Sequence, residues 1–159
     1  MDLVPSPSQT IGPFFQCLLD RFGTSATLVK PDFKGERLQL ALRVLDGDGA
    51  PINDAMIELW QADLGVFGRL PTNDEGACVF ETVKTPHVNV SVFARGLLDR
   101  VVTRIYFAGA PTNEKDPVLS LVPEDRRDTL MAHPDSERPG LWNFTVHLCG
   151  DRETVFFDV

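Results

Sequence analysis

The chain has 159 residues, of which 43% are hydrophobic, and its formal net charge is −8 at pH 7. This length predicts one domain with a buried core, and the acidity argues against nucleic acid or an anionic membrane surface as a partner. Three cysteines without metal-finger spacing, no opening secretory signal and no apolar run near about 20 residues predict a reduced chain in the cytoplasm, outside the membrane.

The first 15 residues are expected to form an extended N-terminal arm, and residues 16–159 a single β-sandwich domain. Three prolines interrupt any periodicity in the arm. The arm ends at Phe14–Phe15, and two phenylalanines gain nothing from exposure to water. They are therefore expected to pack either on their own domain or on a partner.

Beyond the arm, short segments of alternating apolar and polar residues are separated by turns rich in Gly, Asp and Pro. The expected strands are Glu36–Val44, Ala55–Trp60, Cys78–Val83, a strand within His87–Gly96, Val101–Phe107, Trp142–Leu148 and Thr154–Val159. A short helix is expected over Pro123–Met131, because proline and acidic residues open it. Trp60 and Trp142 are expected to anchor the packing. The pattern predicts an all-β fold, an antiparallel β-sandwich with one or two short helices.

The segment that begins at His87 is the most informative of these strands. Three valines occupy one face, so His87, Asn89 and Ser91 share the other. A His-x-His pair on such a strand would point two imidazoles the same way and hold a metal. Here Asn89, a poorer ligand for iron or zinc, takes the second position. His87 is therefore interpreted as a relic of a metal site or as a hydrogen-bonded core histidine.

Several motifs, in order from Ser8 to the C-terminus, resemble those of the intradiol ring-cleaving dioxygenases, and their order is more specific than any one motif. The segments that carry the resemblance are Ser8–Phe14, Asp46–Pro51, Ile57–Asp63, Asp74–Gly76, Pro86–Gly96, Thr103–Phe107 and Glu153–Asp158. The match is closest to the alpha subunits of two-subunit members of this family. It implies the intradiol dioxygenase type of β-sandwich.

The resemblance also implies a division of labour between two chains. In such enzymes the beta chain holds a non-haem Fe(III) through two tyrosines and two histidines, and the alpha chain supplies no ligand but borders the substrate pocket. The enzyme opens 3,4-dihydroxybenzoate with O2 to 3-carboxy-cis,cis-muconate, in aromatic catabolism by the beta-ketoadipate pathway. This chain is accordingly expected to hold no metal and no catalytic residue, and to require an iron-bearing beta subunit. Tyr106 is its single tyrosine, whereas the ligand set needs two.

Four residues are expected to contact the substrate, an aromatic catechol carboxylate. Arg95 ends an apolar strand, and its planar guanidinium suits a carboxylate. From the residues alone, a solvated or salt-bridged arginine is the alternative, and the resemblance favours the pocket. Thr10, Gly12 and Pro13 form a stiff turn that lets the backbone approach a ligand, and the resemblance places this turn beside the bound ring.

The chain is expected to be shorter than the alpha subunits it resembles, with the losses at Phe22–Pro31, Leu64–Phe67 and Val83–Pro86. These are loops, so the sandwich core should survive. Two other functions remain open. One is a binding or accessory module without catalysis. The other is a self-sufficient metalloenzyme built from His87, Tyr106 and His147, which would require residues far apart in the sequence to meet.

Overall fold

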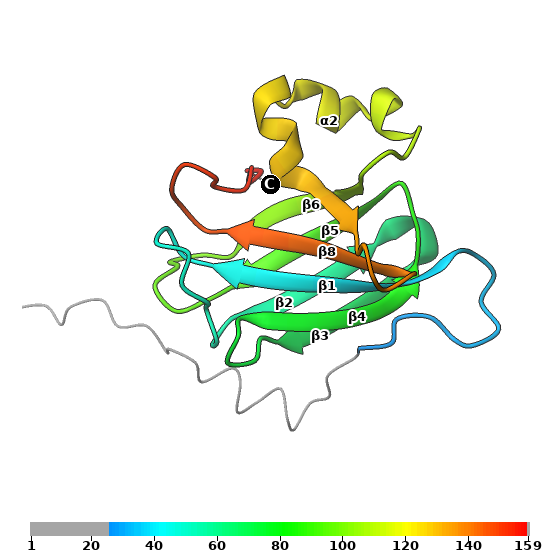
Figure 1. Ribbon diagram of the computed structural model, residues 1–159, viewed down its shortest axis with the longest axis horizontal. Helices are drawn as coiled ribbons and strands as arrows, with labels where there is room; N and C mark the ends of the chain where they lie inside the picture. Colours follow the sequence, from blue (N-terminus) through cyan, green and yellow to red (C-terminus); the bar gives the residue numbers. More distant parts are fainter. Residues whose placement is uncertain (1–25, 159) are drawn as a thin grey trace, which may run out of the picture.

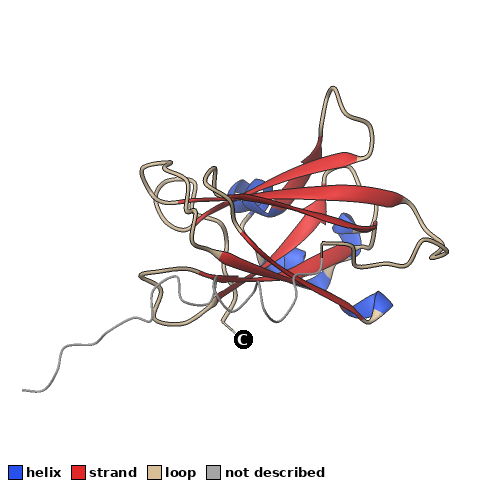
Figure 2. Cartoon of the chain, turned by 90° about the horizontal axis from the view of Figure 1, so that it is seen from below, coloured by secondary structure: helices blue, strands red, loops and turns tan. Residues whose placement is uncertain are grey.

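The computed structural model describes residues 26–158 and contains eight strands in two layers packed face to face (Figures 1 and 2). The strands are β1 (Arg37–Leu45), β2 (Met56–Gln61), β3 (Val66–Pro71), β4 (Ala77–Val83), β5 (His87–Phe93), β6 (Val101–Phe107), β7 (Met131–Pro134) and β8 (Leu141–His147). The helical segments are the 3-10 helices η1 (Ala62–Leu64), η2 (Asn113–Lys115) and η3 (Glu124–Leu130) and the short α-helix α2 (Pro117–Leu121). The expected all-β sandwich with few helices is confirmed.

The strand order is β3-β2-β5-β6-β7-β8-β1-β4. We call β3-β2-β5-β6 the first layer and β7-β8-β1-β4 the second layer, and β7 joins them because it pairs with both β6 and β8. The pairings are antiparallel except for β1–β8 and β6–β7, which are parallel. The helical segments between β6 and β7 gather at one end of the molecule (Figure 1).

Strict alternation explains why the layers face each other. In β1, Leu38, Leu40, Leu42 and Val44 are buried while the intervening side chains are not. Strand β5 repeats this with three buried valines. Because successive side chains of a strand point to opposite faces, each strand contributes one row to a shared apolar core.

Two local expectations were wrong. Strand β3 lies where a loop was expected, at a segment interrupted by Gly68 and ending in Pro71. Thr154–Val159 was expected to be a strand, but residues 154–158 form none, although Phe157 donates a backbone hydrogen bond to the Val102 carbonyl. The helix expected over Pro123–Met131 is confirmed, as the 3-10 helix η3.

The expected arm, with Thr10, Gly12, Pro13 and Phe14–Phe15, lies outside the described residues. Within residues 26–158, no helix is long and apolar enough to cross a membrane.

Trp142 is buried as expected, whereas Trp60 is 44% exposed and is not a core residue, contrary to expectation.

Candidate functional site

Two polar clusters lie at opposite ends of strand β5. One surrounds His87, the first residue of the strand, and the other contains Arg95, which follows the strand. Eight residues of extended chain separate them by about 26 Å. The two clusters therefore cannot belong to one small-molecule site on this chain.

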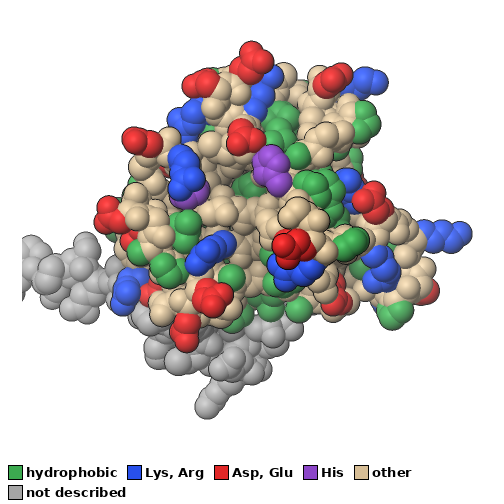
Figure 3. Space-filling view, in the orientation of Figure 1, with side chains coloured by type: hydrophobic (Ala, Val, Ile, Leu, Met, Phe, Trp, Pro, Cys, Tyr) green, Lys and Arg blue, Asp and Glu red, His purple; other side chains and the backbone are tan. Residues whose placement is uncertain are grey.

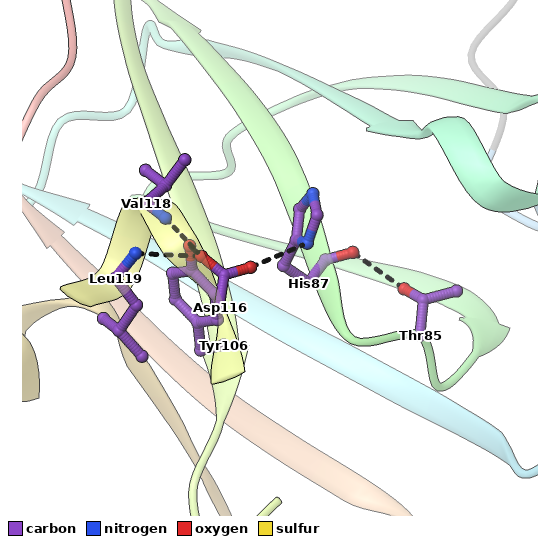
Figure 4. Close-up of polar contacts among 6 residues, drawn as sticks. All are labelled: Thr85, His87, Tyr106, Asp116, Val118 and Leu119. Carbon is purple, nitrogen blue, oxygen red and sulfur yellow. Dashed lines mark hydrogen bonds and ion pairs between the residues drawn. The ribbon is translucent and has the colours of Figure 1, made fainter. Parts of the chain in front are cut away.

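The first cluster joins His87, Tyr106 and Asp116. Strands β5 and β6 place His87 directly opposite Tyr106, with ring centroids 5.9 Å apart. The Tyr106 hydroxyl donates a hydrogen bond of 2.9 Å to Asp116 Oδ1, and His87 Nδ1 lies 3.7 Å from Asp116 Oδ2. Figure 4 shows the carboxylate between the phenol and the imidazole. The hydrogen bond thus ties the segment that precedes α2 to β6, whereas His87 Nδ1 has no hydrogen-bond partner in the described part of the chain.

Asp116 is placed there by its second role as the N-cap of α2. Its Oδ1 also accepts hydrogen bonds from the backbone N–H groups of Val118 (2.9 Å) and Leu119 (2.8 Å). An N-cap aspartate followed by proline at the first helical position is a strong helix-start signal. The short helix therefore holds the carboxylate in one position against Tyr106.

The environment determines the protonation of all three groups. Burial and then the positive charge of Arg104 lower the pKa of His87, against smaller opposing effects of Asp116 and Asp63. Burial raises the pKa of Tyr106 to about 12. Burial alone would raise the pKa of Asp116, but the hydrogen bonds it accepts outweigh this and lower it. Near neutral pH the cluster is therefore a neutral imidazole, a protonated phenol and an ionised carboxylate.

This cluster does not fit a ferric ion. An iron site of the kind that the resemblance implies needs two tyrosines, whereas Tyr106 is the single tyrosine of this chain and its hydroxyl donates a hydrogen bond to Asp116. The neighbouring outward position of β5 is Asn89, which is not an ionisable ligand. Among residues 26–158, no three or more His, Cys, Asp or Glu side chains converge as a metal site would require. The side chains present serve to fix α2 on the first layer.

The second cluster is the ion pair between Arg95 and Asp54. The Arg95 Nε lies 3.2 Å from Asp54 Oδ2, and the Asp54 side chain is only 10% exposed, whereas the Arg95 side chain is 66% exposed. The geometry is that of an ion pair without a well-aligned hydrogen bond, since Oδ2 has no hydrogen-bond partner in the described part of the chain. A nearly buried carboxylate thus anchors one edge of an exposed guanidinium.

The structure brings together some of the residues singled out in the sequence and separates others. His87 and Tyr106 meet, but His147 does not join them, because it lies on β8 and lines a groove of about 530 Å³ together with His133, Asp151 and Arg152. The self-sufficient site of His87, Tyr106 and His147 is therefore not formed. Sequence reasoning missed Asp116, which its Asp-Pro helix start could have revealed, and Asp54, for which no sequence signal exists.

No protein-family model matches the chain. The chain does match several individual curated proteins. The chain is 38% identical to the protocatechuate 3,4-dioxygenase alpha chain of Burkholderia cepacia and 34% identical to that of Pseudomonas putida, in both cases over 99% of this chain and 98% of the relative. It is also 30% identical to the Burkholderia cepacia beta chain, over 62% of this chain and 56% of that relative.

The two alpha-chain alignments run over 196 and 198 positions, whereas this chain has 159 residues. Each relative therefore carries at least 37 positions (196 less 159) that this chain lacks. The expected shortening relative to alpha subunits is confirmed. In the structure, β4 and β5 are joined by only Lys84, Thr85 and Pro86.

Solved structures agree on the fold. The intradiol ring-cleavage dioxygenase from Tetranychus urticae superposes with a TM-score of 0.63 at 18% identity, over 78% of this chain and 85% of that chain. At this identity the likeness concerns the fold alone, whereas the two alpha-chain matches extend over nearly the whole sequence. The chain therefore belongs to the family of protocatechuate 3,4-dioxygenase alpha chains, among the intradiol ring-cleaving dioxygenases.

Proposed function

We propose that this chain is the non-iron-binding alpha subunit of an enzyme that cleaves 3,4-dihydroxybenzoate with O2 to 3-carboxy-cis,cis-muconate. The observation that carries the proposal is the similarity to two alpha chains over almost the entire length. The tyrosine content supports the same assignment, because an iron site of this family needs two tyrosines and this chain has only Tyr106, whose hydroxyl is hydrogen-bonded to Asp116.

The metal in this proposal belongs to the partner. A beta subunit holds Fe(III), which activates the bound catechol for reaction with O2. This chain contributes binding groups at the border of the partner's pocket. Its similarity to a beta chain supports a partner with the same fold.

Arg95 is the described residue best suited to contact the substrate. Its Nε is occupied by Asp54, and within residues 26–158 the two terminal nitrogens have no other partner. A guanidinium anchored in this way retains two parallel donors, the arrangement that binds a carboxylate in bidentate fashion. Arg95 would therefore bind and orient the carboxylate of 3,4-dihydroxybenzoate.

The extended arm of residues 1–15 completes the proposed contact with the partner's pocket. Thr10, Gly12 and Pro13 are assigned to the substrate by resemblance, since they lie outside the described residues. A cytoplasmic location belongs to the same proposal, supported by the free thiols of the buried Cys78 and the exposed Cys149.

The test is to measure iron content and 3,4-dihydroxybenzoate-dependent O2 uptake for this chain alone and for the chain co-expressed with a beta chain from the same organism. Iron and activity in the co-purified complex only are the expected result. Iron and turnover in the single chain would overturn the proposal. An inactive chain that fails to bind a correctly folded beta chain would favour the accessory module.

A further inference from the structure

The outward surfaces of the two layers differ in chemistry. Outward positions of the second layer include Gln39, Arg43, Glu81, Asn143 and Thr145, so most of that surface is polar. Figure 3 views the molecule in the orientation of Figure 1 and shows charged side chains of both signs spread over the visible face. This is the ordinary appearance of a sheet surface that faces water.

The outward surface of β3, β2 and β5 instead carries large apolar side chains, beside the polar Glu58, Arg69, His87, Asn89 and Ser91. Its apolar side chains are Met56, Trp60, Phe67, Pro71 and Phe93, which we call the aromatic face. The strand register places Trp60 directly beside Phe67, and Met56 between Pro71 and Phe93. Within one layer the apolar side chains thus form two groups, with a row of polar side chains, Arg69, Glu58 and Ser91, between them.

The exposed aromatic side chains of this face are large. Trp60 is 44% exposed and Phe67 46% exposed. The Arg69 guanidinium lies 5.5 Å from the centre of the Phe67 ring and pairs with Glu58. Tryptophan, phenylalanine, methionine and arginine are the residues enriched in the buried centres of protein interfaces, and charged groups there are usually paired.

The aromatic face continues into the end of the molecule assigned to the partner. Phe93 closes β5 two residues before Arg95, and Met56 opens β2 two residues after Asp54. A partner that presents its pocket to Arg95 therefore stands next to the row that contains Met56 and Phe93. The similarity of this chain to a beta chain adds that the partner shares the fold, and two chains of one fold commonly pair about an approximate two-fold axis.

We propose that the aromatic face is the surface on which the beta subunit docks, with Trp60 and Phe67 as its anchors. The inference rests on the proposed function, because it adopts the same partner. It adds the surface of this chain that holds the complex together, whereas Arg95 serves the substrate. It also explains why Trp60 is exposed although it lies in a sandwich strand.

The test compares the dissociation constant of the alpha–beta complex for the wild-type chain and for Trp60→Ser and Phe67→Ser. Because both side chains are exposed, the variants should fold, which circular dichroism and thermal unfolding check. Each substitution is expected to raise the dissociation constant roughly 30-fold or more, as loss of an interface anchor does. Val79→Ser is the matched control, since Val79 is 43% exposed on the other layer. It is expected to leave the constant within about twofold.

Four outcomes decide the matter. Weakened complexes for Trp60→Ser and Phe67→Ser, with Val79→Ser unchanged, support the aromatic face as the docking surface. Folded Trp60→Ser and Phe67→Ser variants that bind like the wild type overturn it and leave the proposed function intact. A dimer of the chain alone that both substitutions dissociate would identify a second copy as the occupant and also overturn it. A wild-type chain that binds no beta subunit overturns the proposed function itself.

Discussion

Arg95 and Asp54 form an ion pair across the end of strand β5, with Arg95 Nε 3.2 Å from Asp54 Oδ2. The aspartate is nearly buried and the arginine is largely exposed, so the pair fixes the orientation of a side chain that still reaches solvent. A guanidinium held in this way has lost part of its rotamer freedom before it meets a ligand, which reduces the entropic cost of binding a carboxylate.

Arg95→Ala is expected to raise KM for 3,4-dihydroxybenzoate by about 10- to 100-fold in the alpha–beta complex, because a charge-assisted hydrogen bond to the substrate is lost. Iron content should not change, since the iron belongs to the partner. Steady-state O2 uptake and metal analysis check both. Arg100→Ala, an exposed arginine in the same loop, is the control and should leave KM near the wild-type value. Loss of iron in Arg95→Ala would refute the assignment to the substrate.

Gln61 is expected to be a major contributor to stability. Its buried carboxamide donates hydrogen bonds to the Val83 carbonyl (2.9 Å) and to Thr85 Oγ1 (2.8 Å), and it accepts one from Thr82. Gln61→Ala leaves these partners unsatisfied in the core and should cost about 3 kcal/mol of unfolding free energy. Urea unfolding measures this. Gln39→Ala, at an exposed position of β1, should cost less than about 0.5 kcal/mol, and equal effects would contradict the prediction.

The stability of the fold is expected to fall on mild acidification. Burial and Arg104 lower the pKa of His87 in the folded chain, so the unfolded chain binds a proton more readily. The stabilisation is complete above the unfolded value of 6.5 and is lost as the pH falls from there through the lowered folded value. Thermal unfolding of wild type and His87→Gln as a function of pH isolates this contribution from that of His147, whose pKa is also lowered. His133→Gln serves as the control. Identical pH profiles for wild type and His87→Gln would disprove the effect.

Two turn glycines offer a matched pair of substitutions. Gly76 and Gly49 both have positive φ, at 70° and 80°. A Cβ at Gly76 would lie 2.6 Å from the Val44 carbonyl oxygen, whereas a Cβ at Gly49 meets nothing within 4 Å. Gly49→Ala should therefore cost about 1 kcal/mol of backbone strain, and Gly76→Ala about 3 kcal/mol, because the backbone must also move. Chemical denaturation compares them, and an equal loss in the two variants would show that the close contact relaxes freely.

Local sequence patterns predicted much of the sandwich. Alternation located most of the strands because the two-residue period of a strand is a property of its own side chains. It failed for β3, where Gly68 and Pro71 break the pattern, and for residues 154–158, whose extended chain makes isolated hydrogen bonds and no ladder. It also did not foresee the parallel pairing of β1 with β8, because partners distant in the chain leave no local signal.

The features of the candidate site likewise fall into those that the sequence predicted and those that it did not. The sequence by itself determined that Arg95 follows a strand end, that Asn89 stands where a second histidine ligand would, and that one tyrosine cannot supply two phenolates. Only the tertiary structure decided that Arg95 meets Asp54, that Tyr106 donates a hydrogen bond to Asp116, and that Trp60 faces outward. The physical reason is that ion pairing, burial and the resulting protonation depend on groups brought together from separate elements, and neither composition nor periodicity records those distances.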